Sequence, residues 1–240
     1  MRPILIEAHR GDSSNAPENT LAAFERAVAL GVPSIELDVH AARDGTLMVI
    51  HDDTVDRTTN GTGAVADLSC EELGRLDAGA WFSAAYAGQR PPTLLDVLRV
   101  VAPAATRLNV EVKASPRGDA VAASLVRLLR QVSKQHEYVV SSFDLACLLE
   151  VRRLDDGITL ALLGTMPDIL PLAEKHTLPW IHCHHKSVTA EGVRRAHDRG
   201  IAVNVWTVND PATLGAWRRL GIDKLCTNRP AAMLAAARQA

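Results

Sequence analysis

The amino-acid sequence predicts an α/β protein folded as a (β/α)₈ TIM barrel. Short apolar segments rich in β-branched residues alternate with helical segments eight times, which is typical of a parallel sheet covered by helices. One irregular segment, residues 53–92, interrupts the rhythm; the other 200 residues give 25 to each unit, which favours one barrel domain over residues 1–240. No G-x-G-x-x-G follows the first strand, which disfavours a dinucleotide-binding sheet. An open sheet of six or seven strands is the alternative.

The N-terminal elements form the first strand–helix–strand unit. A strand is predicted at residues 4–8, where ILIEA is short and apolar. A helix over 21–31 follows, because Thr20 is a favourable N-cap and Gly31 a favourable C-cap. The second strand, SIELDVH, is predicted at 34–40.

The second strand leads into a hairpin and then into the irregular segment. Arg43-Asp44-Gly45 has the composition of a tight turn, and LMVI at 47–50 returns as a short strand. Residues 53–92 are rich in Gly, Thr and Asp and are interpreted as a small insertion in the barrel after the second strand. Within the insertion, residues 69–76 are predicted to form one short helix, because S-x-x-E is a capping-box pattern.

The rest of the chain alternates between helices and strands. The helices at 190–199 and 211–220 are each followed by a glycine, Gly200 and Gly221, a common residue after a helix end. In order, a helix is predicted at 93–101, a strand at 107–113, a helix at 119–134, a strand at 137–143, a helix at 145–154, a strand at 159–164, a helix at 167–176, a strand at 180–185, a helix at 190–199, a strand at 201–208, a helix at 211–220, a strand at 223–228 and a helix at 230–238.

Composition excludes several classes of function. The formal net charge of −2, without basic runs, argues against a nucleic-acid binder or a stable membrane-surface anchor. No apolar run reaches the roughly 18 residues of a membrane-spanning helix, and the first ten residues are too polar for a signal peptide. The cysteines (Cys70, Cys147, Cys183 and Cys226) are dispersed, which is typical of reduced thiols. We therefore expect a cytoplasmic protein, and a homo-oligomer stays open.

Three carboxylates mark the predicted functional site. Glu36 and Asp38 lie two apart in the second strand and therefore project from the same face. Glu111, at the end of the third parallel strand, joins them, because the C-terminal ends of barrel strands meet at one mouth. Buried like charges require compensation, and an all-oxygen site selects a hard divalent cation such as Mg²⁺, Ca²⁺ or Mn²⁺.

Basic side chains surround the same strand ends. His9 and His51 have the titration range for an acid–base pair, and Arg10 and Lys113 supply fixed positive charge. A cation with an arginine and a lysine suits an anionic phosphodiester. The alternatives are structural histidines, and carboxylates that Arg10 and Lys113 neutralise without a metal.

Several segments resemble the glycerophosphodiester phosphodiesterase family, and together they cover nearly the whole chain. The first two are long and specific, whereas the last two would be weak alone. In chain order they are AHRG…APENTLAAF (8–11 and 16–24), IELDVHAARDGTLMVIHDDTVDRTTNGTG (35–63), LDAGAWF (76–82), PPTLLDVL (91–98), NVEVK (109–113), VVSSF (139–143), NVWTVN (204–209) and TNRP (227–230).

The resemblance implies the barrel fold, the reaction and the roles of the site residues. It implies hydrolysis of a small-molecule glycerophosphodiester, such as glycerophosphocholine or glycerophosphoethanolamine, to glycerol 3-phosphate and an alcohol. It also implies that one divalent cation, Mg²⁺ or Ca²⁺ with Mn²⁺ as a third choice, is the cofactor. The implied roles are metal binding by Glu36, Asp38 and Glu111, acid–base catalysis by His9 and His51, phosphate binding by Arg10 and Lys113, and an apolar wall for the glycerol moiety at Trp206.

Some residues depart from the family pattern. Glu7 stands where an aliphatic residue is usual, and we expect either a carboxylate below the site or a pair with Lys113. Asn228 stands where many relatives have Asp. In WIHCHHKS, strand alternation predicts that His182 and His184 face one way and Cys183 and His185 the other, so that no tetrahedral metal site forms there. His184 is a candidate for substrate contact, and a solvated or hydrogen-bonded histidine is the favoured interpretation.

Two other functions fit the same pattern. A lysophospholipase D-type phosphodiesterase would need an apolar groove, which the insertion could supply. A non-catalytic barrel that binds glycerophosphodiesters is disfavoured because every expected catalytic position carries a competent residue. The insertion is expected either to restrict head groups at the barrel mouth or to pack its aromatic residues (Trp81, Phe82 and Tyr86) on the rim.

Overall fold

A computed structural model describes residues 3–104, 106–113, 118–132 and 138–239 of the chain. Within these ranges eight parallel strands form a closed barrel, because the first strand of the chain pairs with the second on one side and with the last strand on the other. Around the barrel the strands are β1 (Leu5–His9), β2 (Ser34–Ala41), β4 (Arg107–Val112), β5 (Tyr138–Ser142), β6 (Thr159–Gly164), β7 (Trp180–His184), β8 (Ala202–Trp206) and β9 (Lys224–Thr227). Strand β3 (Leu47–Val49) pairs antiparallel with β2 as the predicted hairpin.

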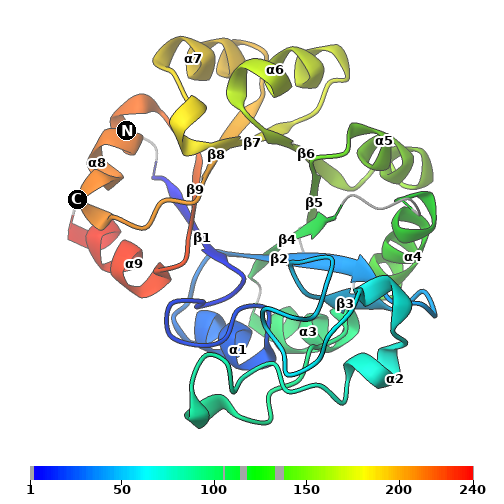
Figure 1. Ribbon diagram of the computed structural model, residues 1–240. Helices are drawn as coiled ribbons and strands as arrows, with labels where there is room; N and C mark the ends of the chain where they lie inside the picture. Colours follow the sequence, from blue (N-terminus) through cyan, green and yellow to red (C-terminus); the bar gives the residue numbers. More distant parts are fainter. Residues whose placement is uncertain (1–2, 105, 114–117, 133–137, 240) are drawn as a thin grey trace.

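Helices form an outer ring around the strands (Figure 1). They are α1 (Leu21–Ala29), α2 (Cys70–Leu73), α3 (Leu94–Val101), α4 (Gly118–Gln131), α5 (Leu145–Leu154), α6 (Met166–Lys175), α7 (Ala190–Asp198), α8 (Leu214–Leu220) and α9 (Pro230–Gln239). The predicted cap of α1 is present: the Thr20 hydroxyl accepts a hydrogen bond from the Ala23 amide. Gly31 adopts the left-handed φ of +70° just beyond the C-cap residue Leu30. None of the helices in the described ranges combines the length and apolar character needed to cross a membrane.

Most observed bounds differ from the predicted ones by one or two residues, and some elements differ more in length or type. The capping box at Ser69 forms, but α2 lasts only one turn. The strand predicted at 201–208 ends at Trp206, and the helix predicted at 211–220 begins with a 3₁₀ turn at Pro211–Thr213, capped by the Asp210 side chain. The predicted residues 133–134 and 137 lie outside the described residues.

Alternate residues of the strands face two different environments. In β2, Ile35, Leu37 and Val39 are fully buried between the barrel and its helices. The intervening Glu36 and Asp38 face the barrel interior and are also buried. The helix-facing side of the strand therefore supplies the packing, and the interior side is left for polar chemistry.

Residues 53–92, which include α2, lie beside the barrel near α1 (Figure 1). They share a small hydrophobic cluster with the hairpin, composed of Ala42, Met48, Ile50, Val55, Val65 and Leu73. The Phe82 ring packs edge to face on the rings of both Trp81 and Tyr86. The Tyr86 hydroxyl donates to the Asn15 carbonyl at 2.7 Å, which ties the insertion to the loop after β1. The insertion thus has its own packing and a fixed contact with the loop that follows β1.

Candidate active site

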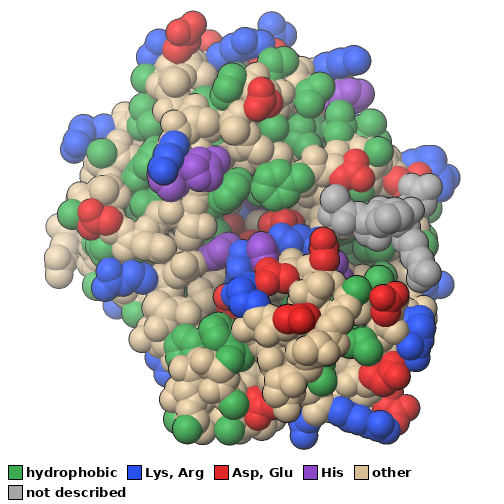
Figure 2. All heavy atoms as spheres, in the orientation of Figure 1, with side chains coloured by type: hydrophobic (Ala, Val, Ile, Leu, Met, Phe, Trp, Pro, Cys, Tyr) green, Lys and Arg blue, Asp and Glu red, His purple; other side chains and the backbone are tan. Residues whose placement is uncertain are grey.

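A cavity of about 90 Å³ opens at the C-terminal ends of the barrel strands. Histidine, basic and acidic side chains gather around a hollow at the centre of this face (Figure 2). The cavity brings together six of the predicted site residues, from β1, β2, β4 and the loops that follow β3 and β4: His9, Arg10, Glu36, His51, Glu111 and Lys113. Trp206, at the end of β8, lines it as well. Asp38 lies beside them in direct contact with Arg10 and Lys113.

The three predicted carboxylates converge. Glu36 and Asp38 come from β2, and Glu111 lies opposite Asp38 in the register of β4. Three carboxylate oxygens, one from each residue, lie within 4.8 Å of one another. The three residues are at most 8% exposed. Their arrangement could hold a metal ion.

Asp38 is neutralised by its neighbours. Its carboxylate lies 3.2 Å from Arg10 Nε and 2.9 Å from Lys113 Nζ, and it accepts a hydrogen bond from Asn19 Nδ2 at 2.8 Å. Burial alone would raise its pKa, but the two cations hold the pKa of Asp38 at about 2. This carboxylate is therefore charged at neutral pH.

Glu36 lacks such compensation. Its Oε2 accepts a hydrogen bond from the Arg10 amide at 3.0 Å, while Oε1 has no hydrogen-bond partner among the described residues. Burial and the neighbouring charges of Asp38 and Glu111 raise its pKa well above the ordinary value. Burial and Asp38 also raise the pKa of Glu111, although Lys113 Nζ lies 2.6 Å away and opposes this. The cluster holds more negative charge than its own side chains neutralise, which fits an added cation.

The turn after β1 positions His9 and Arg10. Arg10 adopts a left-handed φ of +56°, and Gly11 follows at +81°. A Cβ on Gly11 would lie 2.6 Å from the carbonyl carbon of Ala23 in α1, so only glycine allows this close approach. The turn thus needs glycine, and it directs the Arg10 side chain over β2.

Both predicted catalytic histidines have one ring nitrogen held by a hydrogen bond. His9 Nδ1 donates to Asn228 Oδ1 at 2.6 Å, which leaves Nε2 unprotonated in the neutral ring and 3.9 Å from Glu36. Burial, with Arg10 nearby, lowers the pKa of His9 to about 4. His51 Nδ1 lies 2.6 Å from Asp52 Oδ1. Both imidazoles are thereby oriented in the same cavity.

Arg57, from the insertion, links two parts of the site. Its guanidinium donates to Asp52 Oδ2 at 2.7 Å and to Glu18 Oε1 and Oε2 at 2.7 and 3.0 Å. Glu18 in turn accepts from Arg10 Nη1 at 2.7 Å. Glu18 and Arg57 were not among the predicted site residues; both lie inside the segments of family resemblance, but they are 39 residues apart in the chain, which hides their contact.

An apolar wall closes the other side of the cavity. Phe143 and Trp206 pack edge to face with ring centroids 5.8 Å apart, and Leu163 completes the wall. The Trp206 indole donates from Nε1 to the His182 carbonyl at 2.9 Å, which fixes the ring. Trp206 is therefore part of an apolar wall of the cavity, and its contact with a glycerol moiety, which the family resemblance implied, stays a prediction.

One of the two alternatives for Glu7 is confirmed, and the prediction for the histidines of β7 was wrong. Glu7 lies below the site and does not pair with Lys113; its carboxylate accepts a hydrogen bond from Lys224 Nζ at 2.6 Å. His184 and His185 do not face opposite ways, because β7 ends at His184 and His185 begins a 3₁₀ turn, where strand alternation no longer applies. Their rings stack with centroids 4.7 Å apart.

The chain is similar to known proteins over almost all of its length. The model of the glycerophosphoryl diester phosphodiesterase family matches residues 9–232. The glycerophosphodiester phosphodiesterase of Caldanaerobacter subterraneus subsp. tengcongensis is 34% identical over 96% of each chain, and that of Bacillus altitudinis is 34% identical over 94% of each.

A solved structure shows the same architecture. A phosphodiesterase of Oleispira antarctica, in complex with the product sn-glycerol-3-phosphate, superposes with a TM-score of 0.95 at 28% identity, covering 98% of this chain and 97% of its own. Its fold agrees with the closed eight-stranded barrel described above. Together with the family match and the similar enzymes, the barrel and its acidic mouth show that the chain belongs to the glycerophosphoryl diester phosphodiesterase family.

Proposed function

We propose that the protein hydrolyses glycerophosphodiesters to glycerol 3-phosphate and an alcohol with the help of a divalent cation. The observation that carries the proposal is one cavity that holds three converging carboxylates, an unpartnered Glu36 oxygen within the described residues, and two oriented imidazoles. The Oleispira antarctica enzyme has glycerol 3-phosphate as its product, which supports the same product here.

Glu36, Asp38 and Glu111 would hold the cation. Carboxylate oxygens select hard ions, so Mg²⁺, Ca²⁺ and Mn²⁺ are the candidates. When bound, such an ion would polarise the phosphoryl group and lower the pKa of the attacking oxygen, whether that of water or of a substrate hydroxyl. Arg10 and Lys113 border the same cavity, and their charges suit the oxygens of the phosphodiester.

The two histidines divide the proton transfers. His9 suits the general base: its ring is neutral near pH 7 because its pKa is lowered to about 4, and its Nε2 is free to accept a proton. His51 suits the general acid that protonates the leaving alkoxide, with Asp52 fixing its ring orientation. Neither role requires the imidazoles to move far, since both rings already line the cavity.

Incubation with glycerophosphocholine, with and without EDTA, tests the reaction. We expect glycerol 3-phosphate only in the metal-loaded sample, and recovery after adding Mg²⁺, Ca²⁺ or Mn²⁺. Lysophosphatidylcholine serves as a parallel substrate for the lysophospholipase D alternative. Binding of glycerophosphocholine without turnover at any metal concentration would instead favour a non-catalytic barrel.

Replacement of each histidine tests the acid–base pair. We expect His9→Ala and His51→Ala to lower kcat by about 10²- to 10⁴-fold, the range that general acid–base catalysis contributes. His197→Ala is the matched control, because His197 is exposed and bonds only to Asp223, away from the cavity, among the described residues. Wild-type kcat in either site variant would refute the assignment, provided that thermal unfolding shows folded protein.

A further inference from the structure

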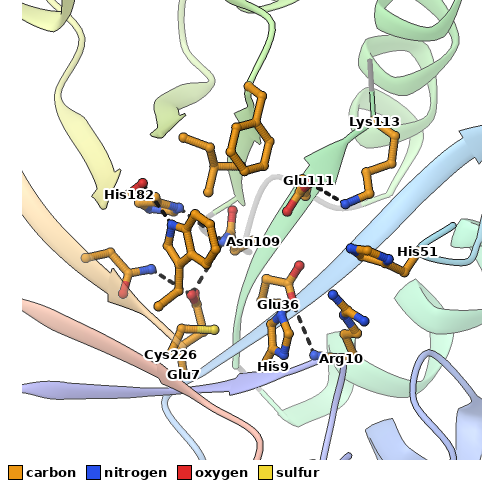
Figure 3. A pocket seen from close by; sticks show the side chains of 14 residues that line it. Glu7, His9, Arg10, Glu36, His51, Asn109, Glu111, Lys113, His182 and Cys226 are labelled. Carbon is orange, nitrogen blue, oxygen red and sulfur yellow. Dashed lines mark hydrogen bonds and ion pairs between the residues drawn. The ribbon is translucent and has the colours of Figure 1, made fainter. Parts of the chain in front are cut away.

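We propose that the bottom of the cavity is a binding subsite for hydroxyl groups of a neutral polyol arm of the substrate. This subsite, called here the polar floor, consists of Asn109, His182 and Asn204, supported by Glu7 and Lys224. The labelled floor residues lie on one side of the pocket in Figure 3, and His9, Arg10, His51 and Lys113 lie on the other. The inference rests on the proposed function and names the part of the substrate that this side would hold.

The polar floor is built on a neutralised charge pair. Glu7 Oε1 accepts from Lys224 Nζ at 2.6 Å and from Ser34 Oγ at 2.8 Å. Glu7 Oε2 accepts from Asn204 Nδ2 at 2.9 Å and from Asn109 Nδ2 at 3.5 Å. Because the carboxylate and the ammonium satisfy each other, the polar floor presents no net charge to a ligand.

These bonds fix which atoms remain free. An ionised carboxylate only accepts hydrogen bonds, so both asparagine amide groups must turn their NH₂ toward Glu7 and their carbonyl oxygens away from it. Asn109 Nδ2 also lies 3.5 Å from His182 Nδ1, which must then accept. The proton of the neutral His182 ring is therefore on Nε2.

The polar floor consequently offers one donor and two acceptors. His182 Nε2, Asn109 Oδ1 and Asn204 Oδ1 have no hydrogen-bond partner in the part of the chain that the structure describes. All three residues are at most 2% exposed and line the cavity. Buried polar groups are normally paired, so three such atoms around one cavity indicate a ligand that supplies the missing bonds.

Hydroxyl groups match this set better than charged groups do. A hydroxyl both donates and accepts, so it can use the His182 N–H together with either carbonyl oxygen. An anion would face two carbonyl oxygens and the Glu7 carboxylate, and a quaternary ammonium has no hydrogen to donate. The carbon skeleton of a polyol could pack against the apolar wall of Trp206 and Leu163, which lines the same cavity.

Substrates with different numbers of hydroxyls test the subsite. Bis(p-nitrophenyl) phosphate carries none, glycerophosphocholine carries them only in its glycerol arm, and glycerophosphoinositol carries them in both arms. The measurement is kcat/KM for each metal-loaded variant, expressed relative to its own value for bis(p-nitrophenyl) phosphate.

His182→Phe removes the donor while keeping a ring in place. We expect it to lower the relative kcat/KM about tenfold, as loss of one buried hydrogen bond predicts, mainly through KM. His182→Gln restores an N–H near the Nε2 position and should recover most of the loss, and His197→Phe should leave the ratio unchanged. A loss for glycerophosphocholine assigns the polar floor to the glycerol arm, and a loss confined to glycerophosphoinositol assigns it to the head group.

A second variant tests the polar floor at another residue, in case His182→Phe does not fold. Asn204→Leu removes one acceptor but leaves Lys224, Ser34 and Asn109 on Glu7, and it should lower the same ratio. An equal loss for all three substrates, or no loss, would overturn the inference, because the polar floor would then only support the barrel.

Failure of the proposed function is distinguishable from failure of this inference. If the wild-type protein hydrolyses no diester, binding of glycerol alone is measured by calorimetry in EDTA. Glycerol binding that His182→Phe weakens and His182→Gln restores would support the polar floor without the reaction. Absence of glycerol binding in that case would overturn it.

Discussion

Two buried glutamates on neighbouring strands have opposite electrostatic environments. Glu7 on β1 is fully buried, which would raise its pKa, yet the Lys224 charge and the hydrogen bonds from Lys224 and Ser34 outweigh burial and lower the pKa to about 2. Glu36 on β2 is 4% exposed, and burial together with the Asp38 and Glu111 charges raises its pKa. Burial acts in the same direction on both, so the difference comes from the neighbouring charges.

The carboxylate of the polar floor is fully neutralised by a basic side chain, whereas the three carboxylates at the mouth of the barrel are only partly neutralised. At the polar floor one carboxylate faces one ammonium group at 2.6 Å. At the mouth, Glu36, Asp38 and Glu111 share Arg10 and Lys113. The comparison teaches that the two regions suit different ligands: the charge pair of the polar floor is complete and needs no ion, so the floor suits a neutral ligand, whereas the carboxylates at the mouth suit an additional cation.

The largest expected effect comes from Glu36→Gln. Loss of this carboxylate should lower kcat/KM on the order of 10⁴-fold, because several kcal/mol of transition-state stabilisation depend on the cation. The metal-free variant should be at least as stable as the wild type, since the cost of burying this group disappears. Urea unfolding in EDTA and a glycerophosphocholine assay measure the two effects. A clear loss of metal-free stability would contradict the comparison.

Lys224→Met, unlike Glu36→Gln, should lower the stability of the protein. Removal of the ammonium leaves the Glu7 charge buried and unpaired, which we expect to lower the free energy of unfolding by about 3–5 kcal/mol. The double variant Glu7→Gln with Lys224→Met should recover most of this loss, because no buried charge remains. Urea titrations of the single and double variants provide the measurement, and equal destabilisation of both would contradict the expected coupling.

The stability of the polar floor should depend on pH in acid. The pKa of Glu7 falls from 4.5 to about 2 on folding, so its contribution is fully present above pH 4.5 and is lost as the pH falls from about 4.5 to about 2. The maximum loss is about 3 kcal/mol. The double variant Glu7→Gln with Lys224→Met should lose less free energy of unfolding over this interval than the wild type. Parallel pH profiles for the two proteins would refute the role of Glu7.

The smallest effect is expected for Arg57→Ala. Arg57 orients His51 through Asp52 and Arg10 through Glu18, but the groups that would meet substrate stay in place. We expect kcat/KM to fall about tenfold, the cost of a few weakened hydrogen bonds. Arg75→Ala is the matched control, since Arg75 belongs to the same insertion but pairs with Glu71 on the exposed helix α2. An equal effect of both variants would show that Arg57 has no particular role.

The repeat of strands and helices could be predicted from the sequence because local patterns determine it. Apolar residues on the helix-facing side, such as Ile35, Leu37 and Val39, identify β2 as a strand covered by helices, and Thr20 marks the start of α1. The alternation of Glu36 and Asp38 placed both carboxylates in the barrel interior, where the structure has them. The predicted boundaries did not distinguish short irregular turns, such as the 3₁₀ turn at Pro211–Thr213 that precedes α8.

The partners of the site residues could not be predicted, because they come from distant parts of the chain. The position of Glu7 below the site was one of the two predicted alternatives, but its partner was not predicted: barrel closure brings β9 beside β1, and Lys224, 217 residues away, is the partner. Arg57 lies 39 residues from Glu18, and no local periodicity relates them. Strand periodicity gives the direction of a side chain and leaves the partner across the barrel undetermined.

The pairing of β1 with β9 has a consequence for synthesis of the protein. A ribosome makes β1 before β9, so Glu7 and His9 are present long before Lys224 and Asn228, their hydrogen-bond partners. Until β9 has been made, the Glu7 carboxylate lacks its ammonium partner and the His9 ring lacks the bond that orients it. The proposed role of His9 in turnover therefore requires synthesis of the chain at least as far as Asn228.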